Sequence, residues 1–281
     1  KVAKGNPRLA SAIGDIAQRR QLLAQSPDTE GVLDVPPFSP LPEVSAAAAK
    51  VELRRALDKA IERGRGAEHA WLKEAARDAA AVNDADLEAV VAVAEGRDAP
   101  AADSFLNSFG LWWIGANAPS LTLVHLLRLE KRNPRHSVQW TLRSRADAET
   151  DPRIIEDAMT RSGWASQAGV ETADWVWQTA DPEAAWPWAA HHLDSVGTQL
   201  ATVETATKAL DVLSHFPRLP NEVLPSVASI AVGDSRVNRP LAQQVLRKHP
   251  AARQLAEQAL TNSRGEIRAA AAAWLAVLDD P

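Results

Sequence analysis

Two copies of one apolar pattern stand thirty residues apart near the end of the chain, at residues 234–246 and 264–276. In each copy the apolar residues recur at i, i+4, i+5 and i+8, a spacing typical of a helix that buries one stripe. Residues 249–260 lie between the copies and have the same spacing, which predicts a partner helix. A helix pair that recurs at a short, fixed period indicates an α-solenoid, in which each pair packs on the next. The matching positions are Val237 and Ile267, Leu241 and Ala271, Ala242 and Ala272, and Val245 and Leu275.

The rest of the chain also predicts helices, so the expected fold class is all-α, an α-solenoid of antiparallel helix pairs. Asn83 and Asp84 predict the cap of a helix that buries its apolar face. Residues 121–129 are apolar almost all round, which indicates a helix at the centre of its neighbours. In residues 67–82 the spacing predicts that Trp71 is buried along with Leu72, Ala75 and Ala79.

Proline density divides the chain into two expected parts. Residues 1–43 are expected to form an N-terminal helix followed by a proline-rich strap, because closely spaced prolines block both helix and sheet. Phe38 and Leu41 favour a strap laid over neighbouring helices rather than a free linker. Residues 44–281 are expected to form one helical repeat domain, with the repeats clearest in 198–281.

Composition restricts the classes of function. The chain has no cysteine, which excludes disulfides, thiol catalysis and zinc–thiolate sites. The net charge of −5 does not indicate a nucleic-acid or anionic-membrane binder. No run of apolar residues is long enough for a transmembrane helix. We expect a cytoplasmic protein without a cofactor or a bound metal, and the two ends of the chain suggest a piece of a longer protein.

Five of the 10 tryptophans lie between residues 164 and 188. Trp175 and Trp177 cannot share one helix face, and neither can Trp186 and Trp188, so some of these rings are expected near the surface or between helix layers. Packing between helices is the plainer interpretation. The alternative is an aromatic platform for a peptide, a base or a sugar, with Trp175, Trp177 and Trp188 as candidate binding residues.

Basic residues are concentrated in one stretch. Residues 128–145 hold six basic residues and one acid, whereas residues 147–211 hold twelve acids and three bases. Arg132, Arg135 and Arg143 are candidates for pairing with carboxylates or phosphates of a partner, and Trp140 could add apolar contact beside them. The alternatives are a solvated face, or arginines that pair with the acidic stretch inside the protein.

Catalytic motifs are missing from the sequence. There is no His-Glu-x-x-His motif, no glycine-rich phosphate loop and no Gly-x-Ser-x-Gly elbow. His191, His192 and Asp194 invite a metal interpretation, but adjacent histidines on a helix point about 100° apart and do not converge on one ion. No nucleophile, base and orienting residue can be assembled from sequence.

The terminal copies resemble HEAT-type repeats, in which an Asp-x-x-Val-Arg motif leads the second helix of each pair. Asp234, Val237, Ile267 and Arg268 keep most of that motif, whereas Asn238 stands at the arginine position and Pro240 lies in the first turn. Over about the last 70 residues the chain looks like the repeat region of large bacterial proteins described as molybdate-metabolism-regulator-like. The resemblance implies a cytoplasmic bacterial protein whose HEAT-like repeats support other domains, and it supplies no catalytic residue.

The leading hypothesis is a non-catalytic protein-interaction or scaffolding module, whose partner is another protein or another domain of the same polypeptide. The alternative is a HEAT-like DNA glycosylase, or another nucleic-acid-binding helical repeat protein, with Asp174 or Asp181 as the catalytic acid beside Trp175, Trp177 or Trp188. A glycosylase needs a basic surface to hold phosphates, and the acids around these tryptophans argue against it. Membrane association is not expected.

Overall fold

The computed structural model describes residues 33–133, 137–247 and 249–279, and in these ranges all regular structure is helical. The helices belong to two compact units, an N-terminal unit of Phe38–Ala184 and a C-terminal unit that contains Ala185–Pro281. The all-α expectation is therefore confirmed. No helix in the described ranges combines the length and the apolar character that crossing a membrane requires.

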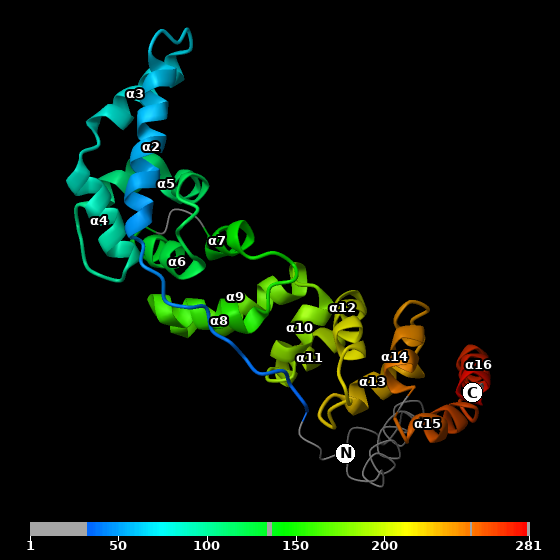
Figure 1. Cartoon of the computed structure of the whole chain (residues 1–281). Helices are drawn as coiled ribbons and strands as arrows, with labels where there is room; N and C mark the ends of the chain where they lie inside the picture. The colour runs from blue at the N-terminus through cyan, green and yellow to red at the C-terminus, as the bar shows by residue number, and fades with distance from the viewer. Residues whose placement is uncertain (1–32, 134–136, 248, 280–281) are drawn as a thin grey trace, which may run out of the picture. The chain divides into compact units, whose positions relative to one another are not determined.

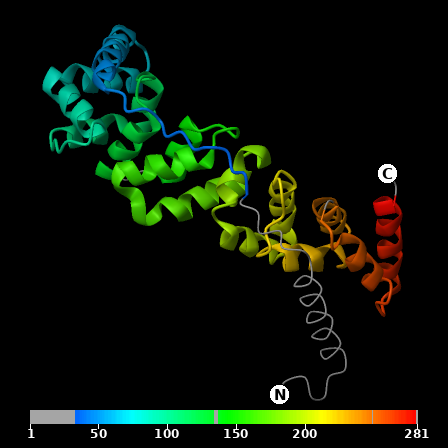
Figure 2. The ribbon, with the colours of Figure 1, turned by 60° about the horizontal axis from the view of Figure 1, so that its bottom comes forward.

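The N-terminal unit begins with an extended stretch followed by a helical hairpin (Figure 1). The guanidinium carbon of Arg153 lies 5.6 Å from the centre of the Phe38 ring. The two hairpin helices lie side by side in both views (Figures 1 and 2). The helices of this unit are α2 (Ala47–Gly64), α3 (Ala70–Ala81), α4 (Asp84–Ala94), α5 (Ala102–Asn117), α6 (Leu123–Arg132), α7 (Val138–Arg145), α8 (Pro152–Met159), the π-helical turn η1 (Thr160–Trp164) and α9 (Ala165–Gln178).

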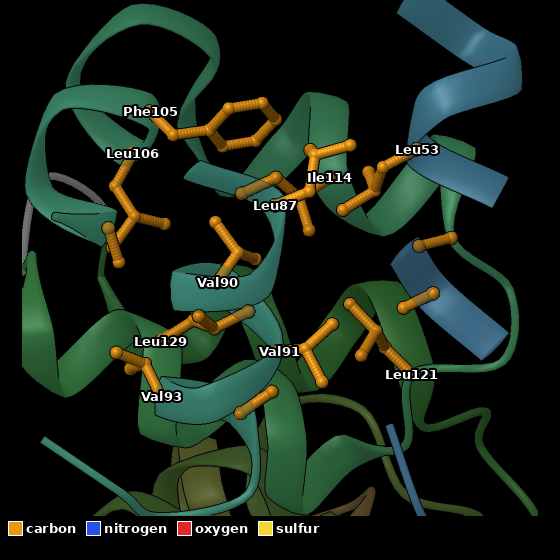
Figure 3. Close-up of a cluster of buried hydrophobic side chains, with 14 of the residues drawn as sticks. Leu53, Leu87, Val90, Val91, Val93, Phe105, Leu106, Ile114, Leu121 and Leu129 are labelled. Carbon is orange, nitrogen blue, oxygen red and sulfur yellow. The ribbon is translucent and has the colours of Figure 1, made fainter. Parts of the chain in front are cut away.

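Helix α6 is the central helix of the N-terminal unit, as its all-round apolar sequence predicts. It packs against α4, α5, α7, α8 and η1. Its buried residues include Glu130, whose carboxylate accepts a hydrogen bond from Thr141 Oγ1 at 3.1 Å. Figure 3 shows the apolar side chains of α2, α4, α5 and α6 that converge beside it.

Helix α4 begins as the sequence predicts. The Asn83 side chain accepts a hydrogen bond from the Asp86 backbone N–H at 3.1 Å, and the Asp86 carboxylate accepts one from the Asn83 N–H at 2.9 Å. This capping box satisfies two N–H groups that the first turn cannot pair. The residues expected to face inward, Leu87, Val90, Val91 and Ala94, are all buried.

Trp71 contradicts the expectation for the second helix of the hairpin. Its side chain is 65% exposed, and in α3 only Ala79 is fully buried. Residues of intermediate exposure, among them Leu72 and Ala75, make up the rest of the packed face. The apolar spacing predicted a helix here correctly. However, α3 packs mainly on α2, so it has too few neighbouring helices to cover its whole apolar stripe.

Helix α10 (Pro182–Ala189) begins at the last residues of the N-terminal unit, and the C-terminal unit continues as a series of short helices. Helices α11 and α12, α13 and α14, and α15 and α16 are in contact, and α12 also packs on α14. In Figures 1 and 2, α14 lies between α12 and α16. The bounds are α11 Leu193–Leu200, α12 Val203–Ser214, α13 Leu224–Ala231, α14 Asn238–Leu246, α15 Ala252–Ala259 and α16 Gly265–Asp279.

The two copies of the repeated pattern do not bury the same face. In the second copy Ile267 is buried as predicted, with 7% of its surface exposed, together with Ala271 and Trp274. In the first copy Val237 is 65% exposed and Asn238 is buried, so the prediction for Val237 is wrong.

Proline explains the difference between the copies. The proline nitrogen carries no hydrogen, so Pro240 is tolerated only in the first turn of a helix. Helix α14 accordingly begins at Asn238, whereas α16 begins at Gly265, several residues earlier in its own copy. Val237 is therefore left outside the helix, and the stripe of α14 shifts to Asn238, Ala242 and Leu246.

Candidate binding site on the C-terminal unit

The arginines expected to meet a partner already have partners within the N-terminal unit. Arg132 donates to Asp103 Oδ1 at 2.7 Å and to Asp98 Oδ1 at 2.8 Å. Its acidic partners therefore come from the start of α5 and the loop before it, not from residues 147–211. Arg143 donates to Gln178 Oε1 at 2.7 Å. Arg135 lies outside the described residues.

Other cations of the same stretch cover the ends of helices. Arg128 donates to the carbonyl oxygen of Ala94 at 3.0 Å, at the end of α4. Arg145 donates to the carbonyl oxygen of Gly115 at 2.7 Å, near the end of α5. The last carbonyls of a helix lack intrahelical partners and carry the negative end of its dipole, which attracts cations. Trp140 is half-buried against the core cluster. The basic stretch thus holds helices together.

The five clustered tryptophans fall in different units and are packed to different degrees. Trp175 in the N-terminal unit and Trp188 in the C-terminal unit are fully buried. Trp188 stacks on His192 with the ring centroids 4.2 Å apart. Trp177 and Trp186 are half-buried, as is Trp164, whose indole N–H donates to the carbonyl of Leu127 at 3.0 Å. These contacts favour the packing interpretation over an open aromatic platform.

The acids of the glycosylase alternative have structural partners. The carboxylate of Asp174 accepts a hydrogen bond from the Gln178 amide. The carboxylate of Asp181 accepts the Glu183 backbone N–H at 2.9 Å at the start of α10, which is a helix cap. His192 is stacked on Trp188, and within the described ranges no group of three or more His, Asp or Glu side chains is placed to hold a metal ion.

A small cavity of about 310 Å³ in the N-terminal unit is lined by groups that bind one another. Glu95 accepts hydrogen bonds from Ser45 Oγ at 2.9 Å and from Arg97, and these bonds, that of Arg97 first, lower the pKa of its carboxyl group. His125 Nδ1 accepts the Thr122 backbone N–H at 3.1 Å. Burial lowers the pKa of His125 below its ordinary value of 6.5, and the nearby charge of Arg128 lowers it further. These groups leave little unused capacity for a ligand.

The C-terminal unit holds two cavities that share Gln244 of α14 and Arg247, the residue that follows this helix. We call the two cavities together the α14 site. The larger cavity has a volume of about 700 Å³, within the range of small-molecule and peptide sites. It lies beside the end of α12, the loop that follows α12, and the end of α14. Its polar and charged lining includes His215, Arg218, Gln244, Arg247 and His249.

The smaller cavity of the α14 site lies between α14 and α16. Its volume is about 370 Å³, and it is lined by Pro240, Gln243, Ala273, Trp274 and Val277 in addition to the two shared residues. Val277 is 53% exposed. The lining is mainly apolar, in contrast to that of the larger cavity.

The charges of the α14 site are of one sign. Arg218 and Arg247 are exposed, and neither guanidinium has an ion pair or hydrogen bond to any residue in the described ranges. No described Asp or Glu lines either cavity. The described arginines of the basic stretch, residues 128–145, are engaged by acids and carbonyl oxygens, whereas the two arginines of the α14 site have no such partner in the described part of the chain.

Two buried N–H groups of the α14 site also have no acceptor among the described residues. One is the indole N–H of Trp274, which is 2% exposed. The other is Nε2 of His249. The Nδ1 atom of His249 accepts the Ala251 backbone N–H at 3.2 Å, so the neutral ring carries its proton on Nε2. Burial lowers the pKa of His249 and so favours the neutral ring. A buried donor without an acceptor costs about 1–3 kcal/mol.

Sequence reasoning missed the α14 site because its residues come from separate helices and a loop spread over residues 213–277. The only local signal was the pairing of histidine and arginine around the prolines at 217 and 250. Comparisons with known proteins add nothing to this assignment, since no family model, no curated protein and no solved structure matches the chain.

Proposed function

We propose that the chain is a HEAT-like α-solenoid that acts as a non-catalytic protein-interaction module, and that a segment of its partner protein binds at the α14 site. The observation that carries the proposal is the pair of arginines, Arg218 and Arg247, that line this cavity without any partner in the described ranges. Unpaired guanidiniums beside a concave, partly apolar surface are typical of a binding site.

The solenoid arrangement is supported by contacts between successive elements of the C-terminal unit. Helices α12 and α14 pack on each other, as do α13 and α14, and α15 and α16. Asp234 and Arg264, the first residues of the two sequence copies, form an ion pair. A contact between corresponding positions of successive copies is what stacked repeats require. The resemblance of the repeats to those of large bacterial proteins supports a cytoplasmic role in a longer polypeptide.

A selection from a random peptide library tests the interaction, with the 281-residue chain as bait. A second selection uses the Gln244→Trp variant as bait. This substitution places a large ring on an exposed residue that lines both cavities and should block the site. Gln254→Trp is the control, because Gln254 is exposed on α15 and lines neither cavity. We expect peptides that bind the original protein and Gln254→Trp but not Gln244→Trp. If no peptide is enriched on the original protein, or if Gln244→Trp binds equally well, the proposed site is wrong.

A further inference from the structure

We propose that the segment bound at the α14 site is acidic and carries an apolar anchor residue, with its carboxylates on Arg218 and Arg247 and its anchor against Trp274. This inference rests on the proposed function and names the chemistry of the partner. It follows from the division of the site into a cationic half and an apolar half, which meet at Gln244 and Arg247.

The cationic half selects for negative charge. Arg218 and Arg247 are joined in the lining by His215 and His249, and no described carboxylate neutralises them there. An arginine binds a carboxylate through two parallel N–H···O bonds, which favours Asp and Glu side chains over neutral acceptors. An acidic ligand therefore pairs with both arginines of the site.

The apolar half selects for a hydrophobic side chain. Pro240, Ala273 and Val277 line the smaller cavity around the buried ring of Trp274. A volume of about 370 Å³ accommodates one large aliphatic or aromatic side chain.

The length of the site separates a peptide from a small anion. Pro240 and Arg247 lie on the same helix or at its end, seven residues apart, which corresponds to about 10 Å at the helical rise. An extended chain covers about 3.3–3.6 Å per residue, so a peptide of three or more residues spans both halves. Inorganic phosphate can reach only one half at a time, and it leaves the apolar half empty.

The test uses the peptides selected on the original protein. The composition of the enriched sequences is compared with that of the starting library, and we expect an excess of Asp and Glu next to Leu, Ile, Phe or Trp. One enriched peptide is then synthesised with a fluorescent label, and its affinity is measured by anisotropy. Arg247→Glu should weaken binding about tenfold or more. Higher salt should also weaken binding to the original protein, because exposed charges are screened.

Arg236→Glu is the matched control. Arg236 is exposed in the same unit, has no partner in the described ranges and lines neither cavity. The variant makes the same change in net charge and should leave the affinity within about twofold.

The outcomes distinguish this inference from the proposed function. Suppose that the peptides bind the original protein but not Gln244→Trp and yet show no excess of Asp and Glu. That result would support the proposed interaction module and contradict the inference that its partner is acidic. Equal losses of peptide affinity for Arg236→Glu and Arg247→Glu would mean that only the net charge of the protein matters. This result would also contradict the inference of an acidic segment bound by Arg247. Full competition by millimolar inorganic phosphate would identify a small-anion site instead.

Discussion

Thr207 Oγ1 donates a hydrogen bond to Asn238 Oδ1 at 2.7 Å, and this contact joins α12 to α14. The amide group of Asn238 also donates to the carbonyl oxygen of Val203 at 2.7 Å, and its backbone N–H donates to Ser235 Oγ at 3.1 Å. Asn238 is 1% exposed. A buried polar side chain whose hydrogen bonds are met in this way fixes the packing of two helices more specifically than an apolar one.

Replacing Asn238 tests that relationship. Asn238→Leu should lower the free energy of unfolding by about 1–3 kcal/mol, because this buried position loses its hydrogen bonds to the Val203 carbonyl and the Thr207 hydroxyl. Urea unfolding measures the change. In a double-mutant cycle with Thr207→Val the two effects should not add, with a coupling of at least about 0.5 kcal/mol. Additive effects would show that the Thr207 contact contributes nothing of its own.

Arg132 should matter for stability. Arg132→Glu places a third carboxylate beside Asp98 and Asp103, so we expect a lower melting temperature. Added salt should reduce the difference from the original protein, since it screens the repulsion. Arg143→Glu is the comparison, because Arg143 is exposed and its partner is the neutral Gln178 amide. If Arg132→Glu and the original protein had the same melting temperature, the ion pairs of Arg132 with Asp98 and Asp103 would not be stabilising.

The buried histidines should make stability depend on pH. The pKa of His125 is lowered first by burial and then by Arg128, and that of His249 is lowered by burial. Below an unfolded pKa of about 6.5 the unfolded chain binds a proton that the folded chain refuses. The contribution to stability should therefore be fully present above about pH 6.5, and it should decrease as the pH falls toward the lowered pKa values of these histidines in the folded protein.

Urea unfolding at a series of pH values between neutral and mildly acidic measures this effect. His125→Gln should flatten part of the dependence, because it removes a group whose pKa is lowered in the folded protein. A flat profile for the original protein would contradict the expected linkage.

Gly64 should be required where α2 passes closest to α3. A Cβ atom added to Gly64 would overlap the Ala76 side chain and lie 2.9 Å from the carbonyl oxygen of Leu72. Gly64→Ala should therefore destabilise the protein by about 1–3 kcal/mol. Gly197→Ala is the matched control. It lies inside α11 with nothing within 4 Å of the added atom, so we expect it to stabilise the protein by about 0.5–1 kcal/mol. Thermal melts of the two variants should move in opposite directions.

Ile267 and Val237 occupy matching positions in the two copies but should respond differently to truncation. Ile267→Ala should cost about 2–4 kcal/mol, because a buried side chain is lost and a cavity remains. Val237→Ala should cost less than about 0.5 kcal/mol, because Val237 is mostly exposed. Equal losses would mean that the two helices bury the same stripe after all.

Local signals were sufficient for the helices themselves. The Asn83 cap, the buried face of α4 and the central position of α6 could be predicted, because caps and apolar periodicity depend on neighbours in the sequence. The predictions for Trp71 and Val237 were wrong because exposure depends on how many helices surround an apolar stripe and on where the helix begins.

The binding stretch proposed from sequence shows a different limit. A run of basic residues indicates charge, but it does not show which of the cations have partners. Arg132 finds its acids about thirty residues earlier in the chain, and Arg145 finds carbonyls at the end of another helix. Arg218 and Arg247 stand apart in the sequence, and only the packing of α12 and α14 brings them to one cavity.

The shifted start of α14 has a consequence for anyone who designs consensus repeats from this chain. Averaging the two copies would favour an aliphatic residue at position 237 and an arginine at position 238, as in the second copy. The aliphatic residue would point to water, and the arginine would occupy the covered slot where Asn238 meets Thr207 and Val203. Such a design would need Pro240 removed as well, so that the helix could begin earlier and rotate the aliphatic residue inward.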